Sequence, residues 1–424
     1  MIKNIGEITQ NLDEIFSLFP EGWQEKAAEL KALPRARNIK TAEDLLMLNL
    51  LYQTNGKSLG GTSSLLKSGG EINLDKNAVY FRIQKSTDWN IWLNQNICRN
   101  LGIVAEKPEF LDGKRVVAID ATDEKMNANG SLLARLHYGV DIYTLEPVES
   151  LMTTGKTGET LTNFNSFKKD DIVLADRAYG SIKSIEHTKA SGADFIIRLK
   201  YNAFAMYCEN GDQLDLKNAI ENMSEGSNKA INANYKVDGK LTPIRICIYR
   251  KTSEQTVNSE RNMKKSNKKK GRTEPNSTQL FFGNYVVVAT SLSFDCKKIL
   301  ELYRQRWQIE ILFKRLKSLF DYDDMPAKTE VTMKAFISGK LLLSGICEAL
   351  VMKGRFPPPL CDKFNPNTSL YRELQIVLAV VTILVSVYCG AFSILPNIED
   401  LSKNCADSPR KRRRALDEFR LNTS

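Results

Sequence analysis

The pattern of apolar and polar positions changes twice along the chain. Residues 1–100 read as helical, with a capping signal from Thr41 to Asp44 ahead of an apolar run. From about residue 110, short apolar runs predict strands at 116–119, 134–144, 147–154, 171–175 and 195–199, with a helix at 181–190. Strands that first follow one another and then alternate with a helix predict a mixed α/β sheet.

The second half of the chain is less regular. A strand at 243–249 lies among polar segments, so we interpret residues 201–280 as an inserted region with its own β structure and a mobile basic loop. A strand returns at 281–290, and a long helix is expected from about Asp295. The last hundred residues read as helical.

One stretch near the end of the chain, residues 376–395, contains no charged side chain and is long enough to cross a bilayer. Length by itself favours a membrane span, and the alternative is a buried helix, interrupted at Gly390. We favour the buried helix, because the chemistry argued below requires access to DNA.

Another ambiguous feature is a pair of short helices expected at 58–67 and 74–85. Their spacing resembles a helix-turn-helix, in which Lys76 and Tyr80 would be among the side chains available to a groove or to phosphates. A plain helical hairpin is the alternative.

Composition narrows the chemistry. The 424 residues predict two or three domains, and the net charge is +10. Residues 250–272 carry a net charge of +7 and residues 403–420 one of +4, so the rest of the chain is close to neutral. Such basic blocks are typical either of nucleic-acid contacts or of solvated loops.

Histidine and cysteine usage excludes several classes of protein. With only two histidines, a His-based zinc site or a Ser-His-Asp hydrolase is a poor hypothesis. The eight cysteines contain no CxxC pair, which favours free thiols in a reducing cytoplasm. The N-terminus lacks the apolar core of a signal peptide, so we expect a cytoplasmic location.

Three carboxylates stand out as candidates for catalysis. Two predicted strands end in Asp120 and Asp176, which would meet at one edge if the strands are neighbours, although such aspartates also cap turns. On the helix predicted over 301–317, Glu310 shares a face of roughly 60° with three other polar side chains. These are Tyr303, Arg306 and Lys317.

An ordinary amphipathic helix would also place these residues on one face. The combination of residues favours a site, because three carboxylates repel one another unless a cation neutralises them. Hard divalent cations prefer oxygen ligands, and two such ions can promote phosphoryl transfer. Arg306 and Lys317 would then hold phosphates.

The motifs together resemble a known family. The pattern Tyr303-x2-Arg306-x3-Glu310-x6-Lys317 is similar to the Y-R-E-K signature of the insertion sequence four family of bacterial transposases. Ile119-Asp120-Ala121-Thr122 resembles its first Asp motif, and Leu174-Ala175-Asp176-Arg177-Ala178-Tyr179-Gly180 resembles its second. The resemblance implies an RNase H-like core with a D-D-E triad and a β-rich insertion before the Glu.

The resemblance also implies roles for the residues. Asp120, Asp176 and Glu310 would be catalytic metal ligands for Mg²⁺, with Mn²⁺ as a substitute. Asp123 is close enough to Asp120 to be a rival ligand, but Asp120 directly ends the apolar run and aligns with the motif. We expect Asp123 to be a loop residue, because aspartate is favoured in turns. Tyr303, Arg306 and Lys317 would contact double-stranded DNA at the terminal inverted repeats. Water would first free a 3′-hydroxyl, which would then attack target DNA. A homodimer is expected, because two ends are cut together.

The expected domains follow from these assignments. They are a helical DNA-binding region (1–105), a first part of the RNase H-like core (106–200), a β-rich insertion (201–280), the last core strand with the Glu-bearing helix (281–330) and a C-terminal helical region (331–424). Three other functions remain open: an inactive DNA-binding relative, a membrane-anchored protein, and a nuclease that cuts without joining.

Overall fold

The structure is a computed structural model. It describes residues 5–35, 38–56, 58–69, 72–102, 105–126, 133–269, 271–352 and 369–390. The second basic block, residues 403–420, and the last five residues of the apolar stretch 376–395 lie outside these ranges. The six cysteines within them are free thiols, as the sequence predicts.

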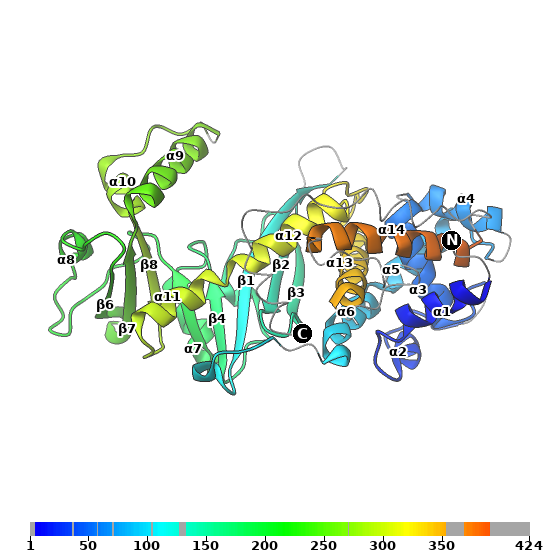
Figure 1. The fold of residues 1–424 in the computed structure, drawn as a ribbon, viewed down its shortest axis with the longest axis horizontal. Coiled ribbons are helices and arrows are strands. Elements are labelled where there is room, and N and C mark those ends of the chain that lie inside the picture. The colour runs from blue at the N-terminus through cyan, green and yellow to red at the C-terminus, as the bar shows by residue number, and fades with distance from the viewer. Residues whose placement is uncertain are drawn as a thin grey trace.

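One mixed sheet of eight strands forms the centre of the molecule, in the order β3-β2-β1-β4-β5-β8-β7-β6 (Figure 1). Only the β1–β4 and β4–β5 pairs are parallel. The strands are β1 (Arg115–Lys125), β2 (Leu133–Asp141), β3 (Pro147–Thr154), β4 (Asp171–Ala175), β5 (Asp194–Arg198), β6 (Asn228–Val237), β7 (Lys240–Arg250) and β8 (Tyr285–Thr290). The predicted mixed α/β fold is confirmed.

Both faces of the sheet are covered. Successive side chains of a strand point to opposite faces, so Val116 and Ala118 belong to one hydrophobic cluster while Val117 and Ile119 belong to the other. The first cluster includes α11 (Cys296–Arg304) and α12 (Trp307–Leu319), and the second includes α7 (Ile182–Ala190). A strand buried on both faces reads as a continuous apolar run, which is why β1 and β4 were predictable.

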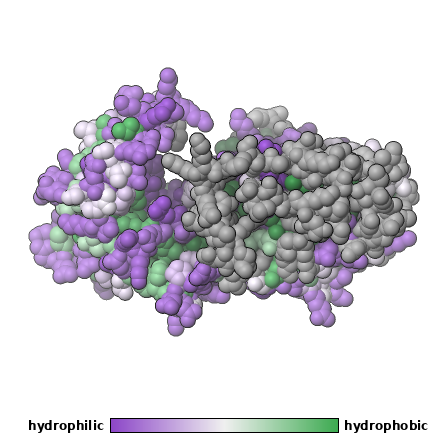
Figure 2. Space-filling view, in the orientation of Figure 1, coloured by the Kyte–Doolittle hydropathy of each residue, from purple (hydrophilic) through white to green (hydrophobic). Residues whose placement is uncertain are grey.

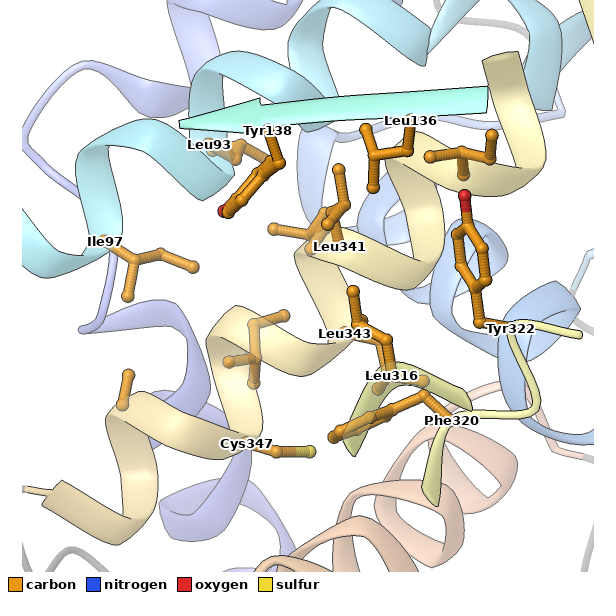
Figure 3. Packing of buried hydrophobic residues seen from close by; sticks show 14 of the residues in the cluster. Leu93, Ile97, Leu136, Tyr138, Leu316, Phe320, Tyr322, Leu341, Leu343 and Cys347 are labelled. Carbon is orange, nitrogen blue, oxygen red and sulfur yellow. The ribbon is translucent and has the colours of Figure 1, made fainter. Parts of the chain in front are cut away.

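The helical parts at the two ends of the sequence form one body with the sheet. Figure 3 shows Leu93 and Ile97 of α6 (Thr87–Leu101), Tyr138 of β2, and Leu341 and Cys347 of α13 (Glu330–Met352) within one packed core. The remaining helices of this body are α1 (Ile5–Phe16), α2 (Trp23–Glu29), α3 (Ala42–Leu51), α4 (Leu59–Gly69), α5 (Lys76–Lys85) and α14 (Leu370–Tyr388). Tyr388 Oη donates a hydrogen bond to Asp44 Oδ1 at 2.9 Å, which ties α14 to α3.

The two helices α4 and α5 confirm the predicted helix pair. Asp75 caps α5 by accepting a hydrogen bond from the Ala78 amide at 2.7 Å. Val79 and Ile83 of α5 are buried, while Lys76 and Lys85 are exposed. Contact of this pair with DNA stays a prediction.

Two described helices are long and apolar enough to cross a membrane. They are α13 and α14, whose most apolar windows are 83% and 50% buried within the protein. Burial of that extent is what the core helix of a globular protein shows. The part of 376–395 that the structure describes is therefore packed on the protein itself, and it ends at Gly390, where φ is +68°.

Residues 201–280 contain the expected β structure, whereas the expectation of a basic loop was wrong. β6 and β7 do not form a separate sheet, because β7 pairs with β8 and continues the central one. Most of the basic block is helix α9 (Ser253–Lys269) and not a loop. No residue of α9 is buried, so no apolar stripe signalled a helix in the sequence.

The same region also contains α8 (Leu216–Ile220) and α10 (Ser277–Gly283). The strand expected at 281–290 begins only at Tyr285, since Phe281 and Phe282 belong to α10.

The burial of His137 on β2 predicts how the stability of the protein depends on pH. The side chain is fully buried, its Nε2 lies 3.1 Å from Thr153 Oγ1, and burial together with Arg135 lowers its pKa to about 4. Since protonation is easier in the unfolded chain, stability should fall as the pH drops below about 6.5. We expect the wild type to lose about 2 kcal/mol of unfolding free energy between pH 7.5 and pH 5 relative to His137→Gln. Denaturant unfolding at both pH values measures the difference, and equal losses in the two proteins would contradict it.

Candidate active site

The first two candidate carboxylates are neighbours at one edge of the sheet. Ile119 of β1 pairs with Ala175 of the parallel strand β4, so Asp120 and Asp176 are the next residues on adjacent strands. Adjacent strands lie about 4.8 Å apart. The predicted convergence of these two strand ends is therefore present in the fold. Asp120 accepts a hydrogen bond from the Ala121 amide at 2.9 Å, and Asp176 accepts one from the Ala178 amide at 2.7 Å.

The helix predicted over 301–317 is interrupted. α11 ends at Arg304 and α12 begins at Trp307, and the turn between them is tightened by hydrogen bonds from the Gln305 amide to Leu302 O and from the Arg306 amide to Tyr303 O. Glu310, Lys317 and Arg306 accordingly sit on or just before α12, while Tyr303 sits on α11. α12 packs against β1, which brings its polar side chains to the carboxylates.

α12 is covered on its polar side as well as on its apolar side. Ile309, Phe313 and Leu316 are buried. The Arg315 side chain is only 14% exposed and lies 3.4 Å from Glu348 of α13. The C-terminal helices, whose position the sequence could not provide, cover that side.

Arg306 lies between two of the three carboxylates. Its Nη1 is 3.5 Å from Asp120 Oδ2, and its Nη2 donates a hydrogen bond to Glu310 Oε1. The guanidinium also lies over the Tyr303 ring, 5.9 Å from its centroid. The Arg306 side chain is only 12% exposed, so this cation is largely withdrawn from water.

The electrostatics of Asp120 show that the carboxylates interact. Burial raises the pKa of Asp120 to about 7, the Ala121 hydrogen bond and Arg306 oppose the rise, and the charges of Asp176 and Glu310 add to it. The three side chains are thus close enough to repel one another, which was the premise of the predicted site.

The donor set fits a divalent cation in kind. Carboxylate oxygens are the ligands that Mg²⁺ and similar hard cations take. Among the described residues, no three His, Cys, Asp or Glu side chains enclose one position, because Glu310 is turned toward Arg306. The Glu310 side chain is 43% exposed, which leaves it room to turn toward Asp120.

Lys317 and Tyr303 are already engaged within the protein. Lys317 pairs with Glu124 of β1, and its Nζ lies 3.3 Å from Asp123 O, so it fastens α12 to β1. Tyr303 is 8% exposed, and burial raises the pKa of its phenol. Tyr303 lies within reach of the Asp176 charge, whereas Lys317 lies beside the part of β1 that follows Asp120.

Asp123, the rival to Asp120, has a different partner. It is part of strand β1, so the expectation of a loop residue was wrong. Arg135, its cross-strand neighbour on β2, binds both carboxylate oxygens at 2.5 and 2.6 Å. This pairing supports Asp120 as the candidate ligand.

Two residues near the carboxylates were missed by the sequence reasoning. Tyr179 is fully buried, its hydroxyl has no hydrogen-bond partner among the described residues, and its phenol lies among the charges of Asp120, Glu159 and Asp176. Glu159 is a fourth carboxylate of this region, and burial raises its pKa. Tyr179 was visible as part of the second Asp motif, whereas nothing in the sequence pointed to Glu159.

Comparison with known proteins decides the family. The family model described as the transposase DDE domain matches residues 112–345, which is more than half of the chain and includes the three carboxylates. The chain belongs to the DDE-domain transposases. It is a DNA transposase, an enzyme that cleaves and transfers DNA strands, and the family implies a dependence on divalent metal.

The relatives of the transposase come from several insertion sequences. InsL of element IS186A and the transposase of element IS421, both from Escherichia coli, are each 29% identical to it over 80% of this chain and 93% of their own lengths. The transposase of element IS231C from Bacillus thuringiensis is 26% identical over 50% of this chain and 48% of its own length.

Proposed function

We propose that this transposase is of the insertion sequence four type, with Asp120, Asp176 and Glu310 as its triad and Mg²⁺ as its metal. The observation that carries the proposal is geometric: Asp120 and Asp176 follow each other on adjacent parallel strands, and Arg306 lies between Asp120 and Glu310. Burial raises the pKa of Asp120 to about 7, and the charges of Asp176 and Glu310 add to the rise. The order of Tyr303, Arg306, Glu310 and Lys317 along α11 and α12 supports the Y-R-E-K assignment.

The bound metal would supply a Lewis acid that activates the attacking oxygen and stabilises the leaving oxygen. The chain's own residues provide positioning. Arg306 has a largely buried guanidinium. When it leaves Glu310, it can bind two phosphate oxygens at the same time. Lys317, held by Glu124, adds a second cation beside the same edge.

The proposed reaction has two stages. Water attacks the phosphodiester at a terminal inverted repeat and frees a 3′-hydroxyl, and that hydroxyl then attacks target DNA. We further propose a homodimer on the paired ends, and the domain division at 105, 200, 280 and 330. The helix pair α4–α5 and the buried apolar body around α13 support the assignment of DNA binding to the first region and of packing to the last.

The test is end cleavage by the purified full-length protein on a duplex carrying its own terminal repeat. We expect cleavage with Mg²⁺ or Mn²⁺, none with EDTA, and joining of a pre-cleaved end to a second duplex. Binding without cleavage would favour an inactive relative, and cleavage without joining would favour a nuclease. Partitioning into membranes that resists high salt would favour the membrane-anchored alternative.

Arg306 offers a graded prediction. In Arg306→Lys the charge is kept, but a single ammonium cannot bridge Asp120 and Glu310 or grip a phosphate with two parallel hydrogen bonds. We expect end cleavage to slow by about 10–100-fold while end binding changes by less than about threefold. Single-turnover cleavage and gel-shift titration measure the two quantities. Wild-type cleavage by the variant would remove Arg306 from the proposed site.

A further inference from the structure

The edge of the sheet that carries the carboxylates continues past them. β8 is antiparallel to both β5 and β7, so β1, β4, β5 and β7 all run in the same direction. Their carboxyl ends therefore lie along one edge. Four residues lie along that edge in the order of these strands: Asp120 after the buried part of β1, Asp176 after β4, Arg198 at the end of β5 and Lys251 just after β7.

The cations on this edge have no acidic partner. In the part of the chain that the structure describes, Arg177, Arg198 and Lys251 form no salt bridge. Lys251 Nζ instead donates to Ser259 Oγ at 2.8 Å and to Gly283 O at 2.6 Å. Burial and the charges of Arg198 and Arg177 lower the pKa of Lys251 to about 8, so the three cations are close enough to repel one another.

Glycine at position 180 allows this close arrangement. A Cβ there would lie 3.0 Å from Arg198 O, so a larger residue would push the loop after β4 away from β5 by a few tenths of an ångström. The loop carrying Arg177 is thereby held against the end of β5. Like charges that the backbone holds close together repel one another, and a bound anion relieves this repulsion and stabilises the cluster.

Helix α9 prolongs the cluster away from the carboxylates. It begins two residues after Lys251 and is joined to that lysine through Ser259. Its inner side carries Ser259 and Met263, while five cations are exposed: Arg261, Lys264, Lys265, Lys268 and Lys269. In Figure 1, α9 and α10 project from the end of the sheet that bears β6, β7 and β8, and Figure 2 shows hydrophilic surface there.

We propose that Arg177, Arg198 and Lys251 form a phosphate-binding cluster that α9 extends, so that duplex DNA leaving the catalytic edge is held by its backbone along this end of the sheet. The proposal rests on the proposed function, because it takes the carboxylate edge as the place where DNA is cut.

The length of the surface favours a polymer over a single phosphate. The 17 residues of α9 span about 25 Å, which is about three-quarters of a turn of duplex and several successive phosphates. Lysines and arginines can neutralise phosphates in any sequence, so we assign the contact to the DNA backbone. The duplex is either the transposon end or the target, and the experiment separates them.

The experiment measures DNA binding of the full-length protein as a function of salt. The variants are Arg177→Ala with Arg198→Ala, and Lys264, Lys265, Lys268 and Lys269 changed together to Gln. The matched control is Lys297→Gln with Lys298→Gln. These two exposed lysines lie at the start of α11, which begins at the edge of the sheet opposite to the carboxylates. Arg198→Lys keeps the charge, and circular dichroism verifies that every variant is folded.

Each lost phosphate contact lowers the slope of log affinity against log salt by about 0.9. We expect the slope to fall by about 1–2 for the double arginine variant and about 2–3 for the α9 variant, with about tenfold or greater loss of affinity at low salt. The control and Arg198→Lys should keep the wild-type slope. Unchanged slopes in both cluster variants, together with wild-type joining to target duplex, would overturn the proposal.

Two measurements distinguish whether the bound duplex is the transposon end or the target. A lower slope on the terminal-repeat duplex assigns the surface to the transposon end. A wild-type slope there, with joining that needs about tenfold more target duplex, assigns it to the target. If the variants lower the salt slope but the wild-type protein never cleaves DNA, the proposed function is refuted and the DNA-binding surface stands. If the wild type cleaves and the variants keep its salt slope and its joining activity, only the surface is refuted.

Discussion

Replacing Glu310 with glutamine should reduce end cleavage by about 10³-fold while end binding stays within about threefold of the wild type. The amide removes a charged metal ligand, and it also removes one of the two negative charges that raise the pKa of Asp120. The Glu310 side chain is 43% exposed, and glutamine has nearly the same shape, so the fold should be unaffected. Single-turnover cleavage with Mg²⁺ measures the effect.

Glu301 provides the matched control for this substitution. It lies on the preceding helix α11 and is exposed, and Glu301→Gln makes the same change of charge and shape away from the carboxylates. We expect wild-type cleavage from the control. Cleavage by Glu310→Gln within threefold of the wild type would remove Glu310 from the triad.

The second large effect concerns stability and not catalysis. Arg115 of β1 donates two hydrogen bonds to Asp171 of β4, at 2.8 and 2.6 Å, and the Asp171 side chain is fully buried. Arg115→Ala leaves that carboxylate charged, buried and without its cation. We expect the free energy of unfolding to fall by about 3–4 kcal/mol, measured by denaturant titration.

An exposed ion pair shows what the burial contributes. Arg99 lies 3.4 Å from Glu146, but its side chain is 68% exposed, so Arg99→Ala should cost less than about 1 kcal/mol. Arg115 also lies at the edge of the sheet opposite to Asp120, so DNA binding by folded Arg115→Ala should be normal. A loss below 1 kcal/mol for both variants would contradict the buried pair.

The strands that form the centre of the sheet were predictable from the sequence because their composition is constrained on both faces. All five residues of β4 are buried, and the apolar run at 171–175 marks the strand without error. α9 was not predictable in this way, because a helix without a buried face leaves no periodic signal. The joining of β6 and β7 to the central sheet depends on pairing with β8, which is remote in sequence.

The candidate site was predictable to a similar extent. Asp120 and Asp176 end apolar runs, and parallel pairing of those runs is enough to bring them together. The bridge from Arg306 to Asp120 and Glu310 depends on the turn between α11 and α12, which a regular helix of 301–317 does not contain. Arg198 and Glu159 come from segments whose position is set only by tertiary packing.

The packing of α13 on α6 and of α14 on α3 has a consequence for synthesis of the protein. The N-terminal helices leave the ribosome first, yet their buried surface is completed by helices that are made after β8, α11 and α12. A nascent chain therefore cannot finish its helical body before the residues of the catalytic edge have been translated. If DNA binding by residues 1–105 needs the complete helical body, only a chain that already contains the carboxylate edge can bind DNA. Stalled or truncated products would then not occupy the transposon ends.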